Sequence, residues 1–149
     1  MDLDTLLNKN QKEAATYLDS HLRIIAGAGS GKTRVVTYRI AHLIQDIGID
    51  PRSILAITFT NKAANEMKER VNEIVGIHGS GTLICTIHSL CVRLLRQHIN
   101  VLNYPSNFTI MDEEDQKALI KKLYTQLEID AKVISIKSMI NTISSYKTA

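Results

Sequence analysis

The residues from 26 to 33 have the composition of a phosphate-binding loop. They read Ala-Gly-Ala-Gly-Ser-Gly-Lys-Thr. This matches the pattern G-x-x-x-x-G-K-[ST], except that Ala26 stands where the first glycine belongs. Glycines let backbone N–H groups turn toward phosphate oxygens, and a helix that follows adds its positive N-terminal end. We therefore expect a nucleotide to bind here; the structural alternative is an ordinary glycine turn before a basic helix.

Two side chains at the end of this loop could act directly on a bound nucleotide. Lys32 would place a positive charge near the β- and γ-phosphates, and Thr33 would offer its hydroxyl to Mg²⁺. The backbone of the loop would surround the phosphates. The candidate nucleotide-binding residues of the loop are Gly27, Ala28, Gly29, Ser30, Gly31, Lys32 and Thr33.

A phosphate loop requires a strand before it and a helix after it, and the hydrophobic pattern predicts both. Short apolar runs typical of buried strands occupy residues 21–26, 53–58 and 82–87. Helical periodicity occupies residues 8–19, 32–45, 61–75 and 88–102. Strands that alternate with helices favour an α/β fold with a parallel sheet of βαβ units.

Beyond Pro105 the pattern is mostly helical. Helices are predicted at residues 113–127, where Asp112 would cap the first turn, and at residues 136–146. Only a brief extended run, residues 108–110, comes before them. The α/β part of the chain is therefore expected to lead into a helical subdomain.

Composition adds little about partners. The formal net charge of +3 is compatible with a polyanionic partner but does not indicate one. Cys85 and Cys91 have the spacing of neither a metal pair nor a redox pair, and we expect buried thiols. The acidic N-terminus has no long apolar run, so we expect no signal peptide, no membrane span and a cytoplasmic protein.

Three further segments accompany the loop in a fixed order. Residues 7–11 read Leu-Asn-Lys-Asn-Gln, residues 57–67 read Ile-Thr-Phe-Thr-Asn-Lys-Ala-Ala-Asn-Glu-Met, and residues 86–91 read Thr-Ile-His-Ser-Leu-Cys. With the loop, they make the chain resemble the superfamily 1 DNA helicases of the UvrD/Rep/PcrA type over essentially its whole length. The resemblance implies an incomplete RecA-like P-loop sheet at residues 1–88, followed by the start of a helical insert subdomain at residues 89–149.

The resemblance also implies roles for single residues. Gln11 matches a glutamine that reads adenine. An amide suits this role, because it offers both a hydrogen-bond donor and an acceptor to the base. Arg34 matches an arginine that lies against the nucleotide. The implied contacts with single-stranded DNA are made by Phe59, Thr60, Asn61, Lys62, Thr86 and His88. From residue type alone, Phe59 could equally be a core aromatic and His88 a structural histidine, so these alternatives stay open.

The implied function is that of an ATP-dependent DNA helicase that uses Mg²⁺. Such a protein translocates on single-stranded DNA and unwinds duplex DNA, 3′ to 5′ by family, in repair or replication. Two alternatives remain: a subunit of a recombination-repair helicase–nuclease, and a non-catalytic nucleotide- or DNA-binding module. A nucleotide kinase is disfavoured, because no second set of basic phosphate clamps is present.

Residues 112–115 read Asp-Glu-Glu-Asp and imitate the D-E-x-D box that holds Mg²⁺ in helicases. We interpret them as the start of a helix, because the preceding run is short and contains the polar Thr109. Acidic residues also stabilise a first helical turn. The catalytic acids would then lie outside this chain, which we expect to end within the helical insert and to be unable to unwind DNA alone.

Overall fold

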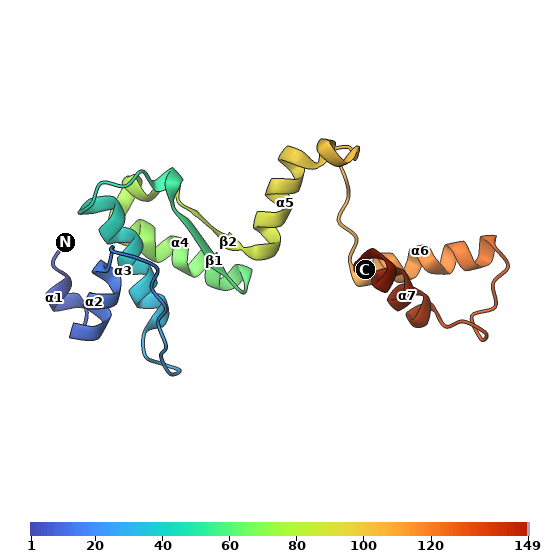
Figure 1. The fold of residues 1–149 in the computed structure, drawn as a ribbon, viewed down its shortest axis with the longest axis horizontal. Coiled ribbons are helices and arrows are strands. Elements are labelled where there is room, and N and C mark those ends of the chain that lie inside the picture. Colours follow the sequence, from blue (N-terminus) through green and yellow to red (C-terminus); the bar gives the residue numbers. More distant parts are fainter. Residues whose placement is uncertain (149) are drawn as a thin grey trace. The chain divides into compact units, whose positions relative to one another are not determined.

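The computed structural model describes residues 1–148, which form two compact units. The first unit is Met1–His98 and the second begins at Ile99. Figure 1 shows the course of the chain, with the α-helices and strands labelled in chain order.

The first unit contains five α-helices, two strands and two short 3-10 helices among its residues. The helices are α1 (Leu3–Leu6), α2 (Lys9–Thr16), α3 (Lys32–Gln45), α4 (Asn61–Val75) and α5 (Ile87–His98). The strands are β1 (Leu55–Thr58) and β2 (Leu83–Thr86), and the 3-10 helices are η1 (Pro51–Ser53) and η2 (Gly76–Gly79). The bounds of α3 and α4 equal those predicted from the sequence.

The two strands form a small parallel sheet. Leu55 lies opposite Leu83 and Thr58 lies opposite Thr86, and α4 makes the crossover between the strands. Parallel strands require a connection of this kind, because the chain must return to the end of the sheet at which the first strand began. The predicted parallel βαβ unit is confirmed for these two strands.

The strand predicted at residues 21–26 is wrong: the structure has no strand there. In the described part of the chain β1 and β2 pair only with each other, and no further segment joins their sheet. A strand needs a neighbour for its N–H and C=O groups, so an apolar run without one stays irregular. Its side chains are accordingly exposed, and Ile25 keeps 85% of its surface.

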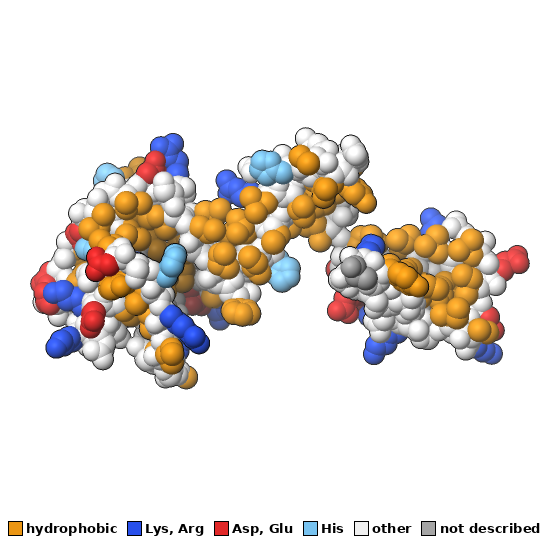
Figure 2. All heavy atoms as spheres, viewed as in Figure 1, with side chains coloured by type: hydrophobic (Ala, Val, Ile, Leu, Met, Phe, Trp, Pro, Cys, Tyr) orange, Lys and Arg blue, Asp and Glu red, His pale blue; other side chains and the backbone are white. Residues whose placement is uncertain are grey.

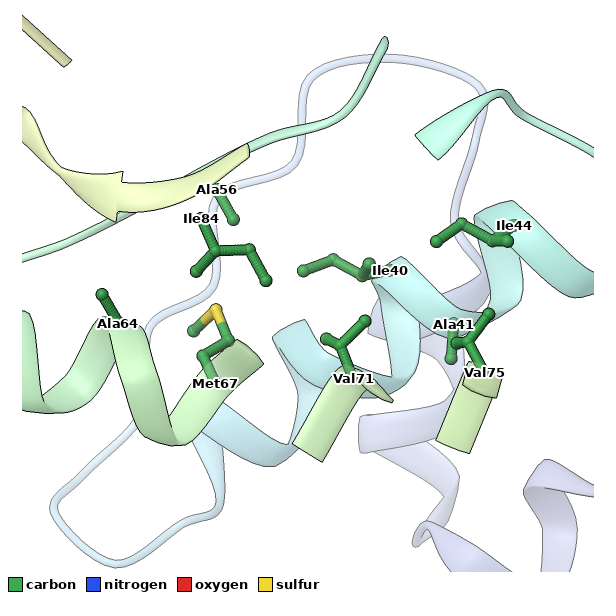
Figure 3. Packing of buried hydrophobic residues seen from close by; sticks show 9 residues of the cluster. All are labelled: Ile40, Ala41, Ile44, Ala56, Ala64, Met67, Val71, Val75 and Ile84. Atoms are coloured by element: carbon green, nitrogen blue, oxygen red, sulfur yellow. The ribbon is translucent and has the colours of Figure 1, made fainter. Parts of the chain in front are cut away.

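The main core lies between the sheet and two helices. Figure 3 shows Ala56 of β1 and Ile84 of β2 directed toward side chains of α3 and α4. The cluster consists of Ile40, Ala41, Ile44, Ala56, Ala64, Met67, Val71, Val75 and Ile84. Because only one face of the sheet is covered in this way, Leu55 and Ile57 on the other face remain about half exposed.

A second, smaller cluster attaches α1 and α2 to the start of α3. Its buried members are Leu3, Leu7, Ala15 and Val35. Arg39 of α3 strengthens this attachment, since its guanidinium donates to the backbone oxygens of Ala14 and Tyr17 at the end of α2. Those oxygens are thereby satisfied without further helical N–H groups, which explains why α2 ends at Thr16 and not near residue 19 as predicted.

The second unit contains the 3-10 helix η3 (Ile99–Leu102) and the helices α6 (Glu113–Gln126) and α7 (Ile136–Thr148). Ile120 and Tyr124 of α6 are its buried side chains. The helices predicted at residues 113–127 and 136–146 are both present, as α6 and α7. The helix predicted at residues 88–102 instead ends at His98 and continues as η3. Among the described helices, none combines the length and apolar character that a membrane crossing needs.

Candidate nucleotide and nucleic-acid sites

The loop predicted to bind phosphate leads into the N-terminus of α3. Gly31 is the residue before the helix, with φ of 82°, and no side chain caps the first turn. Gly29 also has a positive φ, of 73°. Left-handed backbone at both positions favours glycine. The N–H groups of the first turn of this 14-residue helix have no partner within the helix, which makes its N-terminus suitable for an anion.

Lys32 crosses the loop from its C-terminal end. Its ammonium donates to the backbone oxygen of Ala26 at 3.0 Å and to that of Gly27 at 2.6 Å. The side chain is nevertheless exposed, so the charge faces solvent beside the loop. An ammonium group that can bind these oxygens can bind phosphate oxygens in the same way.

Gln11 contacts the same loop from α2. Its side-chain nitrogen Nε2 donates to the backbone oxygen of Ser30 at 3.0 Å. Its oxygen Oε1 accepts from the Asn8 N–H at 3.1 Å, while the Gln11 N–H donates to the Asn8 side chain at 2.9 Å. Asn8 and Gln11 therefore form a reciprocal capping box at the start of α2. The predicted adenine reader lies directly beside the predicted phosphate loop.

The side chain of Arg34 contacts α1. Its guanidinium donates to the backbone oxygen of Leu6 at 2.8 Å and lies over the ring of Tyr38, 5.6 Å from the ring centre. The structure therefore gives Arg34 a role in joining α1 to α3. Contact with a nucleotide, which the resemblance implies for Arg34, stays a prediction.

The residues of the loop fit a nucleotide triphosphate with Mg²⁺. A Cβ added at Gly27 or Gly29 would meet no atom within 4 Å, so the space beside both is open. Thr33 is exposed in the first turn of α3, next to Lys32. Free helix N–H groups, an ammonium and a hydroxyl are the groups that hold phosphates and their metal in P-loop proteins.

The predicted DNA-binding residues gather at one edge of the sheet. The parallel register brings Thr58 and Thr86, the last residues of β1 and β2, opposite each other. The segments that follow both strands, each of which opens a helix, therefore leave the sheet at the same edge. Phe59 comes directly after β1, and its side chain is fully exposed, at 102% of the reference value. Phe59 is therefore not the core aromatic that the sequence left open.

Two of these residues act as helix caps. The Thr60 hydroxyl accepts from the Ala63 N–H at 3.1 Å at the start of α4. The Thr86 hydroxyl is buried, accepts from the Ser89 N–H at 3.2 Å and pairs with the Ser89 hydroxyl at 2.9 Å. Of the six candidates at this edge only Thr86 is buried; the exposed ones are Phe59, Thr60, Asn61, Lys62 and His88.

The residues at positions 112–115 cap α6. The Asp112 carboxylate accepts from the N–H groups of Glu114 and Asp115, both at 2.8 Å. The Asp115 carboxylate accepts in return from the Asp112 N–H at 3.3 Å. The predicted helix start is confirmed.

Of the two free cysteines, Cys91 is exposed and Cys85 half-buried, so the prediction of two buried thiols is wrong.

Sequence reasoning missed three features of the site, two of which had a local signal. The capping box of Asn8 and Gln11 was readable from the spacing Asn-x-x-Gln before a helix. The stacking of Arg34 on Tyr38 was readable from their i, i+4 spacing on α3. The bond from Gln11 to Ser30 had no local signal, because it joins residues 19 positions apart.

A glycine-rich loop at the start of a helix, with an amide from α2 beside it, is an arrangement typical of P-loop nucleotide-binding proteins. Residues 7–149 match the family described as the UvrD/REP helicase N-terminal domain. The chain belongs to this family.

Known relatives carry related names. The chain is 48% identical over 141 residues to the "ATP-dependent DNA helicase PcrA" of Bacillus subtilis (strain 168). It is 46% identical over 141 residues to proteins of the same name from Staphylococcus aureus (strain NCTC 8325 / PS 47) and Staphylococcus epidermidis. These matches cover 95% of the chain but only 19% of each relative, so the chain spans about a fifth of their length.

Proposed function

We propose that the chain is the nucleotide-binding part of an ATP-dependent DNA helicase. The observation that carries the proposal is the loop of residues 26–33 at the N-terminus of α3, with Lys32 across it and Gln11 beside it. Family membership and relatives named as ATP-dependent DNA helicases support it. The two-stranded parallel sheet would be part of a larger RecA-like P-loop sheet, with residues 1–88 in that domain and residues 89–149 in a helical insert.

Each part of the site has a role in this proposal. Bound MgATP supplies the phosphoanhydride whose hydrolysis drives movement. Lys32 holds the β- and γ-phosphates with its ammonium, Thr33 offers its hydroxyl to Mg²⁺, and the loop backbone surrounds the phosphates. Gln11 meets the adenine edge. Arg34 would lie against the nucleotide.

The sheet edge would form part of the path of single-stranded DNA. Phe59 offers an exposed ring on which a base can stack, and the N-terminus of α4 with Lys62 can meet a phosphate. Thr60 and Thr86 act by shaping this edge, since both cap the helices that follow the strands. The intact protein would translocate on single-stranded DNA 3′ to 5′ and unwind duplex DNA during repair or replication.

Replacement of Lys32 tests the proposal directly. Lys32→Ala should abolish most of the affinity for a fluorescent ATP analogue in the presence of Mg²⁺, because the ammonium that neutralises the phosphates is lost. The matched control is Lys68→Ala, since Lys68 is an exposed lysine of α4 outside the loop. Affinity unchanged within about twofold in Lys32→Ala would refute the assignment of the loop.

A further inference from the structure

The side chain of Gln11 makes two hydrogen bonds that the reading of adenine does not require. Oε1 accepts from the Asn8 N–H, which completes the cap of α2. Nε2 donates to the backbone oxygen of Ser30, in the middle of the phosphate loop. We call these two bonds together the Gln11 bridge. They connect the start of α2 to the loop before α3.

The geometry around Gly31 indicates that the contact is close. A Cβ at Gly31 would lie 2.8 Å from Gln11 Nε2, closer than real Cβ contacts come. Gly31 thus admits the amide to the loop, in addition to providing the left-handed backbone before α3. Glycine is therefore needed at position 31 for two reasons: the left-handed backbone before α3 and the close approach of the Gln11 amide.

The bridge uses half of the hydrogen-bonding capacity of the amide. A glutamine side chain has two N–H donors and two acceptor lone pairs on its oxygen. The Ser30 oxygen takes one donor, and the Asn8 N–H takes one lone pair. One donor and one acceptor remain, and these are what the N7 and N6 groups of adenine need from an amide.

We propose that Gln11 is a positioning residue for the phosphate loop as well as a reader of the base. Its cap bond fixes the amide on α2, its bond to Ser30 holds the loop in the curled form, and its remaining donor and acceptor are left for a purine. Phosphate affinity therefore depends on Gln11 even when the ligand has no base. This inference rests on the proposed function, because it takes the loop as the phosphate site.

The test separates loop order from base reading with two variants. Gln11→Met keeps the length of the side chain but removes both bonds of the bridge. Asn8→Ala removes the other arm of the capping box, the Asn8 side chain, and leaves the Gln11 amide on Ser30. If the cap alone mattered, the two variants would behave alike.

The first measurement needs no ligand. Backbone order parameters from NMR relaxation at Gly27, Gly29 and Gly31 should fall in Gln11→Met and stay near the original values in Asn8→Ala. Unchanged order in Gln11→Met, or an equal fall in both variants, would overturn the proposal. This readout stays decisive even if the proposed function is wrong.

The second measurement uses tripolyphosphate with Mg²⁺, a phosphate chain without a base, in calorimetric titration. Its affinity should fall about three- to tenfold in Gln11→Met, the factor expected for one net hydrogen bond. Loss of ATP affinity with unchanged tripolyphosphate affinity would mean that Gln11 reads only the base. Tripolyphosphate binding that is absent from the original chain, or that survives Lys32→Ala, would refute the proposed function instead, and the order parameters would then decide the role of Gln11.

Discussion

The environment of Phe59 is the main reason to expect that the sheet edge contacts a ligand. A phenylalanine at the end of a strand is usually packed, because burial of its ring is favourable. Here the ring is fully exposed, while its neighbour Thr60 caps α4 and Thr58 donates its hydroxyl to the Thr60 backbone oxygen. The local bonds hold the backbone on both sides of Phe59, so the ring is presented to solvent from a fixed position.

Phe59→Ala should therefore weaken binding of single-stranded DNA by the intact protein without affecting its stability. The expected loss is about 1–3 kcal/mol per stacked base. It can be measured by fluorescence anisotropy with a labelled oligothymidine, while thermal melting checks the fold. Unchanged DNA affinity would exclude Phe59 from the path of the DNA. A large fall in melting temperature would show instead that the ring supports the fold.

At the scale of the elements, local signals predicted the helices and a non-local requirement limited the strands. The predicted bounds of α3 and α4 are confirmed because nearby residues set them: Gly31 precedes α3, Thr60 caps α4 and Gly76 ends α4 with a positive φ. The apolar run at residues 21–26 has the same local pattern as the two strands that do form. Its fate depends on a pairing partner elsewhere in the chain, which no local pattern can reveal.

In the candidate site, too, local features could be predicted from the sequence and contacts between separate elements could not. The loop sequence indicated which backbone and side-chain groups lie at the start of α3. The bonds of Gln11 to Ser30 and of Arg34 to Leu6 join separate elements, so they could not be predicted from spacing. Composition also did not predict that Thr86 would be buried as a cap while His88 lies exposed in the same turn.

The C-terminal end of α3 gives a prediction about pH. His42 Nδ1–H donates to the Asp46 carboxylate at 2.7 Å, and the amino group of Met1 donates to it at 3.0 Å. These bonds, that of His42 foremost, lower the pKa of Asp46 below its ordinary value of 3.8. Because the folded-state pKa is depressed, the stabilisation is present above the unfolded-state pKa and is lost as pH falls through the folded-state pKa.

Asp46→Asn should accordingly lower the melting temperature at neutral pH, and the difference should shrink as the pH falls below about 4. Differential scanning calorimetry between pH 2.5 and 7 would measure it, with Asp19→Asn in the exposed segment after α2 as the control. A difference that is the same at every pH would mean that Asp46 stabilises α3 by some interaction other than its charge.

At the scale of the whole molecule, one face of the first unit carries a group of exposed apolar side chains. Figure 2 shows hydrophobic side chains gathered over β1, β2 and α5. They include Leu55, Ile57, Ile87, Leu94 and Leu95, each between 41% and 49% exposed. Contiguous apolar patches of this kind promote association of protein molecules in solution.

Ile57→Lys should reduce self-association of this chain at high concentration, because it places a charge in the centre of the exposed sheet face. Folding stability should fall by about 1 kcal/mol, since about half of the isoleucine surface is buried. Sedimentation velocity over a range of concentrations would measure the effect. Ser53→Lys, which adds the same charge at an exposed position outside this face, should leave association unchanged; an equal reduction there would attribute the effect to net charge alone.

The parallel pairing of β1 with β2 also has a consequence for the order of folding. Neither strand can pair until the intervening chain has crossed back along the sheet, so β1, α4 and β2 must assemble together. Val71 of α4 and Ile84 of β2, both nearly fully buried, belong to the core that this assembly forms. Truncation of either should slow refolding of the first unit, whereas truncation of Leu3 in the separate cluster of α1 should mainly accelerate unfolding. The crossover that forms the sheet would then be the folding nucleus, onto which the nucleotide-binding segment docks later.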